Sequence, residues 1–196
     1  MKKIGITQRV IFKDGKTLDR LDYEWHDFLV KCKLPYQLIS NDPNKISLSF
    51  INNFAGIILT GGNSLISCGG DSFLRDVTEK KIYRFALKIN IPLIGVCRGM
   101  QIIQEMNGIK IQKVFGHVKK KQRVLINKKN IFTNSYHNYG SRFNSSCFKV
   151  FAKTDDGVIK GIANNNKKVF GIMWHPERNK YYSNFDIQLF KKIFIR

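Results

Sequence analysis

Two patterns of apolar and polar positions alternate through the first half of the chain. Short apolar runs predict strands, and the last two runs are apolar enough for strands that are covered on both faces. The strands are expected at 4–7, 36–39, 55–59 and 92–96. Apolar residues at helical spacing predict helices at 19–32, 71–90 and 98–106. This alternation favours a parallel sheet with right-handed crossover connections.

Two of these helices carry more specific expectations. In the helix over 19–32, Asp19 stands where a side chain can cap the N-terminus. In the helix over 71–90, the apolar side chains are expected to face the core. They are Phe73, Leu74, Val77, Ile82, Phe85, Ala86 and Ile89.

After residue 110 the pattern changes to strands joined by turns rich in Asp, Asn and Gly. The expected elements are strands at 110–115, 122–126, 148–154, 158–163 and 167–173, and a helix at 185–194. Such strands should add antiparallel pairing at an edge of the sheet or form a flanking layer. We therefore expect one α/β domain over 1–196, with a mostly parallel central sheet flanked by helices and added antiparallel strands in the second half.

Composition excludes several classes of protein. Hydrophobic residues make up 43% and charged residues 24% of the chain, which is unlike a disordered protein. The apolar runs are far shorter than the roughly 20 residues that span a bilayer, and no secretion signal is evident. The four cysteines form no C-x-x-C pair, so no metal site, cofactor or disulfide framework is expected. We expect a soluble, cytoplasmic protein with reduced thiols and no membrane partner.

The charge is unusual, because 34 Lys and Arg against 14 Asp and Glu give a formal net charge of +20. Such a surplus attracts anions, and nucleic acid is the first candidate partner. The lysines are spread along the chain, however, without a recognition helix or an aromatic sheet surface on which bases stack. A nucleic-acid-binding module remains the non-enzyme alternative, whereas an enzyme acting on a small anionic substrate needs no nucleic-acid partner.

The sharpest motif is Gly95-Val96-Cys97-Arg98-Gly99, where an expected strand meets an expected helix. It has the G-x-nucleophile-x-G form of a nucleophile elbow, with cysteine in place of serine. Glycines permit the tight turn, and the N-terminus of the following helix favours the thiolate of Cys97. The alternative is a small buried core cysteine, the commonest state of a cytosolic cysteine.

A base and a carboxylate follow the strand expected at 167–173. In an extended segment residues two apart point to the same side, so His175 and Glu177 can face one site. With Cys97 they predict a Cys-His-Glu triad, in which the imidazole takes the thiol proton and the carboxylate fixes its tautomer. The alternative is a surface turn in which His175 and Glu177 face water.

Two backbone groups can stabilise an oxyanion next to Cys97. One is the N–H of Arg98, and the other comes from the Gly61-Gly62 turn after the strand expected at 55–59. The carboxyl ends of adjacent parallel strands would bring the two together. The alternative for the Gly61-Gly62 turn is an ordinary connection between a strand and a loop.

Four motifs follow one another along the chain: Thr60-Gly61-Gly62, Gly95-Val96-Cys97-Arg98-Gly99-Met100-Gln101, Ser135-Tyr136-His137 and Trp174-His175-Pro176-Glu177. Their order and placement resemble those of the class I glutamine amidotransferase-like superfamily. The C-R-G-x-Q form and the opening I-G-I-T segment look most like its γ-glutamyl hydrolase (peptidase C26) branch. The resemblance implies a flavodoxin-like three-layer fold in which Cys97, His175 and Glu177 form the triad.

The same resemblance implies roles for further residues. The backbone N–H groups of Gly62 and Arg98 would bind the oxyanion. Gln101 and the main chain around Ser135 and Tyr136 would hold the α-amino and α-carboxylate groups of a glutamyl substrate. His137 is expected to be structural.

The reaction implied is hydrolysis of a γ-glutamyl amide through a γ-glutamyl thioester, with release of glutamate. The chain is similar to compact members in which the leaving nitrogen is carried on cytidine diphosphate, in capsule phosphoramidate synthesis. Two alternatives stay open: a glutaminase subunit that supplies ammonia to a synthase on a separate chain, and a hydrolase of γ-glutamyl-polyamine or γ-glutamyl-GABA. Only the glutaminase requires a synthase partner, and association into a homo-oligomer stays open.

A substrate with a pyrophosphate needs cationic side chains beyond the strand ends. The candidates are Arg9, Arg98, Lys119 to Lys121 and Arg123, with Arg9 and Arg98 favoured. The alternative for the lysine run is a solvated loop.

Overall fold

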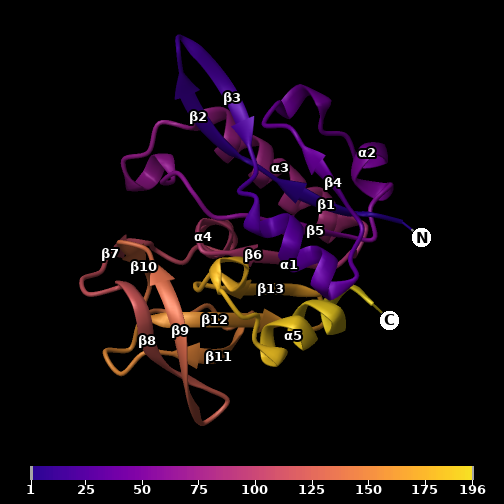
Figure 1. Cartoon of the computed structure of the whole chain (residues 1–196). Coiled ribbons are helices and arrows are strands. Elements are labelled where there is room, and N and C mark those ends of the chain that lie inside the picture. Colours follow the sequence, from indigo (N-terminus) through magenta and orange to yellow (C-terminus); the bar gives the residue numbers. More distant parts are fainter. Residues whose placement is uncertain (1, 196) are drawn as a thin grey trace.

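A nine-stranded sheet runs through the protein in the computed structural model, which describes residues 2–195 (Figure 1). In order across the sheet, the strands are β4 (Tyr36–Ile39), β1 (Ile4–Thr7), β5 (Gly56–Leu59), β6 (Leu93–Val96), β13 (Val169–Ile172), β12 (Ile159–Asn164), β11 (Lys149–Lys153), β8 (Val118–Ile126) and β9 (Lys129–Tyr136). Met1 and Arg196, the ends of the domain expected over 1–196, lie outside the described residues.

The half of the sheet from β4 to β13 is parallel, and the half from β12 to β9 pairs antiparallel. This confirms the expected mostly parallel sheet with added antiparallel strands. The strand expected at 167–173 was assigned to the antiparallel part, and this was wrong, because β13 pairs in parallel with β6. Its residues are largely buried, as a central strand covered on both faces requires. The carboxyl ends of β1, β5, β6 and β13 therefore lie along one edge.

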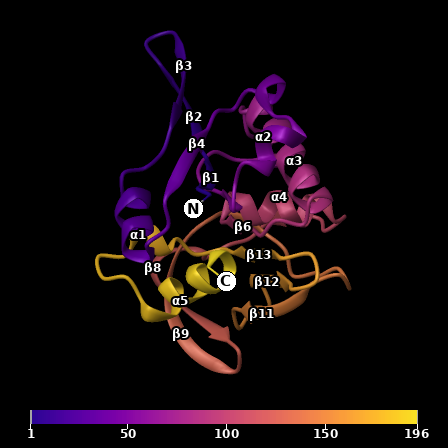
Figure 2. The same ribbon diagram turned by 90° about the vertical axis from the view of Figure 1, so that its right-hand side faces the viewer.

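Helices cover both faces of the parallel half, and Figure 2 shows the sheet between them. On one face lie α1 (Glu24–Cys32) and α5 (Asn184–Phe194), where the rings of Phe28 and Phe190 meet edge to face at 4.9 Å. On the other face lie α2 (Leu48–Asn52), α3 (Phe73–Lys88) and α4 (Arg98–Met106), which pack Ile82, Met100 and Ile103 into a second core. This is the three-layer arrangement that the resemblance implied.

The segment before α1 differs from the expectation. The helix expected at 19–32 begins only at Glu24, and the preceding residues form a hairpin of β2 (Arg9–Lys13) and β3 (Lys16–Arg20) that projects from the body (Figure 1). An Asp14-Gly15 turn, with φ of 51° and 69°, joins its strands, the backbone form that two-residue hairpins favour. Asp19 caps no helix, and its carboxylate accepts hydrogen bonds from Asn41.

Helix α3 buries a different set of side chains from the one expected. Phe73 and Leu74 are 62% and 55% exposed. The buried residues of its first turns are instead polar or charged: Arg75, Asp76, Thr78 and Glu79. The reason is charge pairing inside the protein, since the guanidinium of Arg75 lies 3.1 Å from the Glu79 carboxylate. Ile82, in the second half, faces the core as expected.

Short elements complete the chain. Only β7 (Gln112–Lys113) forms in the strand expected at 110–115, and it pairs with β10 (Tyr139–Gly140). Strand β9, which the sequence did not predict, pairs with β8. Single turns of 3-10 helix occur at η1 (Pro43–Lys45), η2 (Ile66–Cys68) and η3 (Pro176–Arg178). Within residues 2–195, no helix combines the length and apolar character needed to span a membrane.

Candidate active site

A cavity of about 280 Å³ opens beside Cys97, at the carboxyl ends of the parallel strands. It gathers most of the expected site residues, whereas Glu177 and Ser135 lie behind its wall. The lining residues are Arg9, Gly62, Asn63, Ser64, Cys97, Arg98, Gln101, Tyr136, His137, Asn138, Tyr139, His175 and Arg178. The segments that carry the four sequence motifs therefore converge on one place.

Cys97 occupies the strained turn that the elbow motif predicted. Its φ of 54° and ψ of −104° lie between the end of β6 and the first turn of α4. The two flanking glycines are required because the chain passes itself closely: a Cβ on Gly95 would lie 2.3 Å from the Gly99 carbonyl carbon, and one on Gly99 would lie 2.1 Å from the Leu59 oxygen. The Cys97 N–H donates to the Ile172 carbonyl at 2.7 Å, which ties the elbow to β13.

His175 and Glu177 face the same site and contact each other. Nδ1 of His175 lies 2.6 Å from Oε1 of Glu177, and both side chains are buried. Asn134 holds the His175 backbone on both sides, because its Oδ1 accepts from the His175 N–H and its Nδ2 donates to the His175 carbonyl. A Cβ placed on Gly61 would lie 3.3 Å from Nε2 of His175 and 3.4 Å from Cβ of Cys97. Nε2 is thus the ring nitrogen on the cysteine side.

The charges of these three groups favour an ionised cysteine. Burial by itself would raise the pKa of Cys97, but the charge and hydrogen bond of His175 bring it below its ordinary value. Burial opposes the protonated form of His175, yet Glu177 and Cys97 raise the pKa of the imidazole to about 10. A thiolate next to an imidazolium is the reactive form of a catalytic cysteine.

The turn after β5 lies against this pair. Gly62 has a φ of +79°, which favours glycine, and a Cβ on Gly61 would lie 2.5 Å from Cε1 of His175. Gly62 and Arg98, the two expected oxyanion donors, line the cavity together with Cys97.

The expected glutamyl-binding residues form the adjoining wall. Gln101 lies one helical turn after Cys97, and its amide donates to the Tyr139 carbonyl at 2.8 Å. Tyr136 is 38% exposed, with its ring centroid 5.8 Å from that of His175. The guanidinium of Arg178 lies 5.2 Å from the centre of the same ring.

Ser135 is buried behind this wall with a lysine that sequence reasoning missed. Lys160, on β12, is 1% exposed, and its Nζ lies 3.0 Å from Oγ of Ser135 and 2.5 Å from Nε2 of His137. Burial lowers the pKa of Lys160 to about 7. Burial, with the charge of Lys160, also lowers the pKa of His137. The signal in the sequence was a lysine inside an otherwise apolar strand.

Two arginines stand at the mouth of the cavity and share one carboxylate. Arg9 forms an ion pair with Asp22, and Nη2 of Arg178 lies 3.2 Å from the other oxygen of the same side chain. Arg9 was expected to bind substrate, whereas Arg178 and Asp22 were not identified from the sequence. The signal for Arg178 was a cationic residue directly after Glu177.

The other cationic candidates lie elsewhere. The Arg98 side chain was expected to bind pyrophosphate, and this was wrong, because it is buried and forms ion pairs with Asp76 and Glu79. Lys119 and Lys121 lie on β8 and line a separate depression. Arg123 lines that depression too and pairs with Asp155 on the surface. These residues do not line the cavity beside Cys97.

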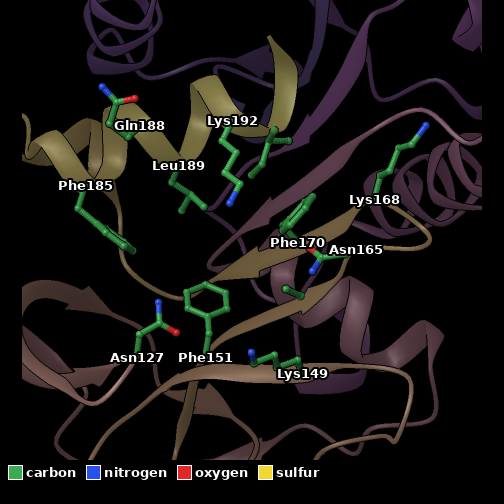
Figure 3. A pocket seen from close by; sticks show the side chains of 12 residues that line it. Asn127, Lys149, Phe151, Asn165, Lys168, Phe170, Phe185, Gln188, Leu189 and Lys192 are labelled. Atoms are coloured by element: carbon green, nitrogen blue, oxygen red, sulfur yellow. The ribbon is translucent and has the colours of Figure 1, made fainter. Parts of the chain in front are cut away.

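The largest cavity, of about 570 Å³, lies under α5 at the amino end of β13, away from Cys97 (Figure 3). Phe151, Phe170 and Phe185 lie along it, with Lys149 and Lys192 at its rim. No cysteine or histidine is among its lining residues. Size alone would favour this cavity, but the reactive groups lie in the smaller one.

Comparison with known proteins agrees with this geometry. The family model of glutamine amidotransferase class-I matches residues 19–196. The chain is 31% identical over 200 residues to the gamma-glutamyl-CDP-amidate hydrolase of Campylobacter jejuni, with 97% of this chain and 96% of that protein covered. It is 25% identical over 176 residues to the GMP synthase of Dictyostelium discoideum, covering 74% of this chain but only 22% of that protein.

Solved structures share the fold at lower identity. A GMP synthase-like protein from Thermoplasma acidophilum superposes with a TM-score of 0.74 at 16% identity, covering 99% of this chain and 93% of that one. A glutamine amidotransferase from Thermotoga maritima gives a TM-score of 0.71 at 14% identity, covering 98% and 84% of the two chains. The family model and the relative matched over nearly its whole length lead to one conclusion: this chain belongs to the class I glutamine amidotransferase family.

Proposed function

We propose that this enzyme hydrolyses a γ-glutamyl amide by way of a γ-glutamyl thioester on Cys97, as a Cys-His-Glu hydrolase of the peptidase C26 type. One observation carries the proposal: Cys97 stands on a strained elbow beside His175, whose Nδ1 is held 2.6 Å from Glu177. An activated nucleophile with a base and an orienting carboxylate is the arrangement that acyl transfer requires.

The first half of the reaction forms the thioester. The Cys97 thiolate attacks the γ-carbonyl carbon, and the carbonyl oxygen becomes an oxyanion facing the N–H groups of Gly62 and Arg98. The C–N bond then breaks, and the imidazolium of His175 gives its Nε2 proton to the leaving nitrogen. Glu177 keeps the imidazole in the tautomer with a proton on Nδ1.

The second half returns the enzyme to its starting state. A water molecule gives a proton to Nε2 of His175, and its oxygen attacks the thioester carbon. The C–S bond breaks, glutamate leaves, and Cys97 and His175 again form the thiolate and imidazolium pair.

The leaving group is the part of the substrate on which the cationic rim acts. Arg9 and Arg178 stand at the cavity with Asp22 as their shared partner, and guanidinium groups bind phosphate oxygens in pairs. The Campylobacter jejuni relative is named for a γ-glutamyl-CDP-amidate. We therefore assign this chain a small anionic γ-glutamyl substrate, with γ-glutamyl-CDP-amidate giving glutamate and cytidine diphosphoramidate as the specific reaction.

Two other functions compete with this assignment. A glutaminase subunit would release ammonia for a synthase on a separate chain, and the similarity to part of a GMP synthase favours it. A γ-glutamyl-polyamine hydrolase would bring a cationic leaving group to a rim that carries Arg9 and Arg178, and like charges repel. A nucleic-acid-binding module would not need the geometry around Cys97.

The test compares glutamate release from glutamine, a γ-glutamyl-polyamine, γ-glutamyl-GABA and a γ-glutamyl nucleotide amidate. We expect the nucleotide amidate to have the highest kcat/KM, Cys97→Ser to be inactive, and Cys147→Ser, a cysteine outside the cavity, to remain active. Turnover of glutamine alone, and only with a partner protein, would support the glutaminase. No hydrolysis of any γ-glutamyl amide, with DNA binding that survives Cys97→Ser, would refute the enzyme.

A further inference from the structure

Four charged side chains lie buried beneath the Gly61-Gly62 turn and the elbow: Arg75, Asp76, Glu79 and Arg98, here called the buried charge network. Each is at most 3% exposed. We propose that Arg75 is a positioning residue that holds the Gly62 N–H in the direction needed to meet the oxyanion, in register with the N–H of Arg98. This inference rests on the proposed function and assigns a role to a group that the mechanism above does not use.

The Arg75 guanidinium binds three successive carbonyl oxygens of the turn. Nη2 donates to the oxygens of Thr60 and Gly61, each at 2.9 Å, and Nη1 donates to that of Gly62 at 2.7 Å. It also donates to Oδ1 of Asn63 at 2.8 Å. One planar group therefore fixes the orientation of consecutive peptide units through which β5 runs into the site.

The peptide between Gly61 and Gly62 gives these contacts a consequence. In a planar trans peptide the C=O and the following N–H point in opposite directions. Because the Gly61 oxygen points to Arg75, the Gly62 N–H points away from it. Gly62 has the positive φ that lets the backbone turn at this point without a side chain in the way.

The same network reaches the second donor. Oε1 of Glu79 accepts from Nε of Arg75 at 3.1 Å and from Oγ1 of Thr7 at 2.8 Å. Its other oxygen, Oε2, pairs with Arg98, as does the carboxylate of Asp76. Arg98 is the residue directly after Cys97, so α3 connects the turn and the elbow through one set of side chains.

The network stays ionised where it lies. Burial opposes the charge of Glu79, but the neighbouring Arg98 and Arg75 hold its pKa below the ordinary value. Burial and the charge of Arg98 lower the pKa of Arg75 to about 10, which leaves it protonated at neutral pH. Buried ion pairs often add little net stability compared with apolar side chains of the same size. Their directional hydrogen bonds, in contrast, fix geometry.

The test uses Arg75→Lys in the whole enzyme, which keeps the charge but loses the planar fork. We expect kcat to fall by about 10- to 100-fold with KM little changed, since loss of one oxyanion donor costs about 10²- to 10³-fold in kcat. Alkylation of Cys97 by iodoacetamide, which forms no oxyanion, should keep its rate and pH profile. Arg84→Lys, the same substitution at an exposed position of α3, should leave both reactions unchanged.

A second variant covers the case in which Arg75→Lys does not fold. Thr7→Val keeps the side-chain shape but removes the hydroxyl that donates to Glu79 and accepts from the Thr60 N–H. We expect a smaller fall in kcat, again with normal alkylation. Folded variants with unchanged kcat, or with alkylation lost in step with kcat, would overturn the role of Arg75. Failure of the proposed function would look different, because the wild-type enzyme would then release no glutamate.

Discussion

Glu177 holds His175 through a 2.6 Å contact that is closed to solvent, and the opposite nitrogen of the ring is the one on the side of Cys97. The carboxylate has one oxygen on the imidazole, and the guanidinium of Arg178 lies 3.8 Å from that same oxygen. This contact sets both the tautomer and the charge of the histidine. The ionisation of Cys97 therefore depends on a residue that does not touch substrate.

Replacing Glu177 by Gln should shift the pH dependence of the thiol. Without the carboxylate the pKa of His175 falls, the imidazolium is lost at lower pH, and the pKa of Cys97 rises. The acid limb of the iodoacetamide alkylation rate, measured from about pH 5 to 10, should move to higher pH. An unchanged profile would mean that Glu177 does not control the charge of the pair.

Removing the cationic rim should affect substrates according to their leaving group. Arg9→Gln and Arg178→Gln each remove a charged hydrogen bond worth about 1.5–3 kcal/mol, which corresponds to about a 10- to 100-fold rise in KM for a γ-glutamyl nucleotide amidate. Glutamine carries no anionic leaving group, so its KM should change little. Asp22→Asn should have the opposite effect, because it releases both arginines. Equal effects on both substrates would argue against a leaving-group site.

Lys160 should make stability depend on pH. Its pKa is about 7 in the folded protein against an ordinary 10.5, so between these values the unfolded chain holds a proton that the folded chain lacks. Stability from this group is therefore lost as the pH falls from about 10.5 to 7. Lys160→Met should raise Tm relative to wild type most at pH 7 and below, with the difference shrinking towards pH 10. A difference that does not vary with pH would contradict the buried, destabilised ammonium.

A methyl group at the elbow should damage both stability and activity. Gly95→Ala places a Cβ 2.3 Å from backbone atoms of Gly99, so the elbow must shift. Overpacking of this kind costs about 1–3 kcal/mol, and kcat should fall with it because Cys97 moves. Gly157→Ala is the matched control, since that glycine has a positive φ but open space around it. It should lower Tm modestly and leave kcat unchanged.

Local signals explain what the sequence predicted well. The Gly-x-Cys-x-Gly segment and the His-Pro-Glu segment place Cys97, His175 and Glu177 by short-range geometry, and the apolar runs locate the parallel strands. The projecting hairpin was missed although Asp14-Gly15 is a strong turn signal, because the apolar spacing after Asp19 was extended backwards into a helix.

Long-range pairing explains what the sequence did not predict. Asp22 and Arg178 are 156 residues apart and meet only because α1 and the segment after β13 pack together. The buried face of α3 is charged because it meets Arg98 from another helix. No periodicity within α3 distinguishes a buried ion pair from a solvated polar face.

The most direct measurement is mass spectrometry of the enzyme quenched in acid during turnover of a γ-glutamyl amide. We predict a γ-glutamyl group on the peptide that contains Cys97, absent from Cys97→Ala, with glutamate release lost in that variant. Glutamate release that continues in Cys97→Ala, with no label on the wild-type Cys97 peptide, would contradict the account.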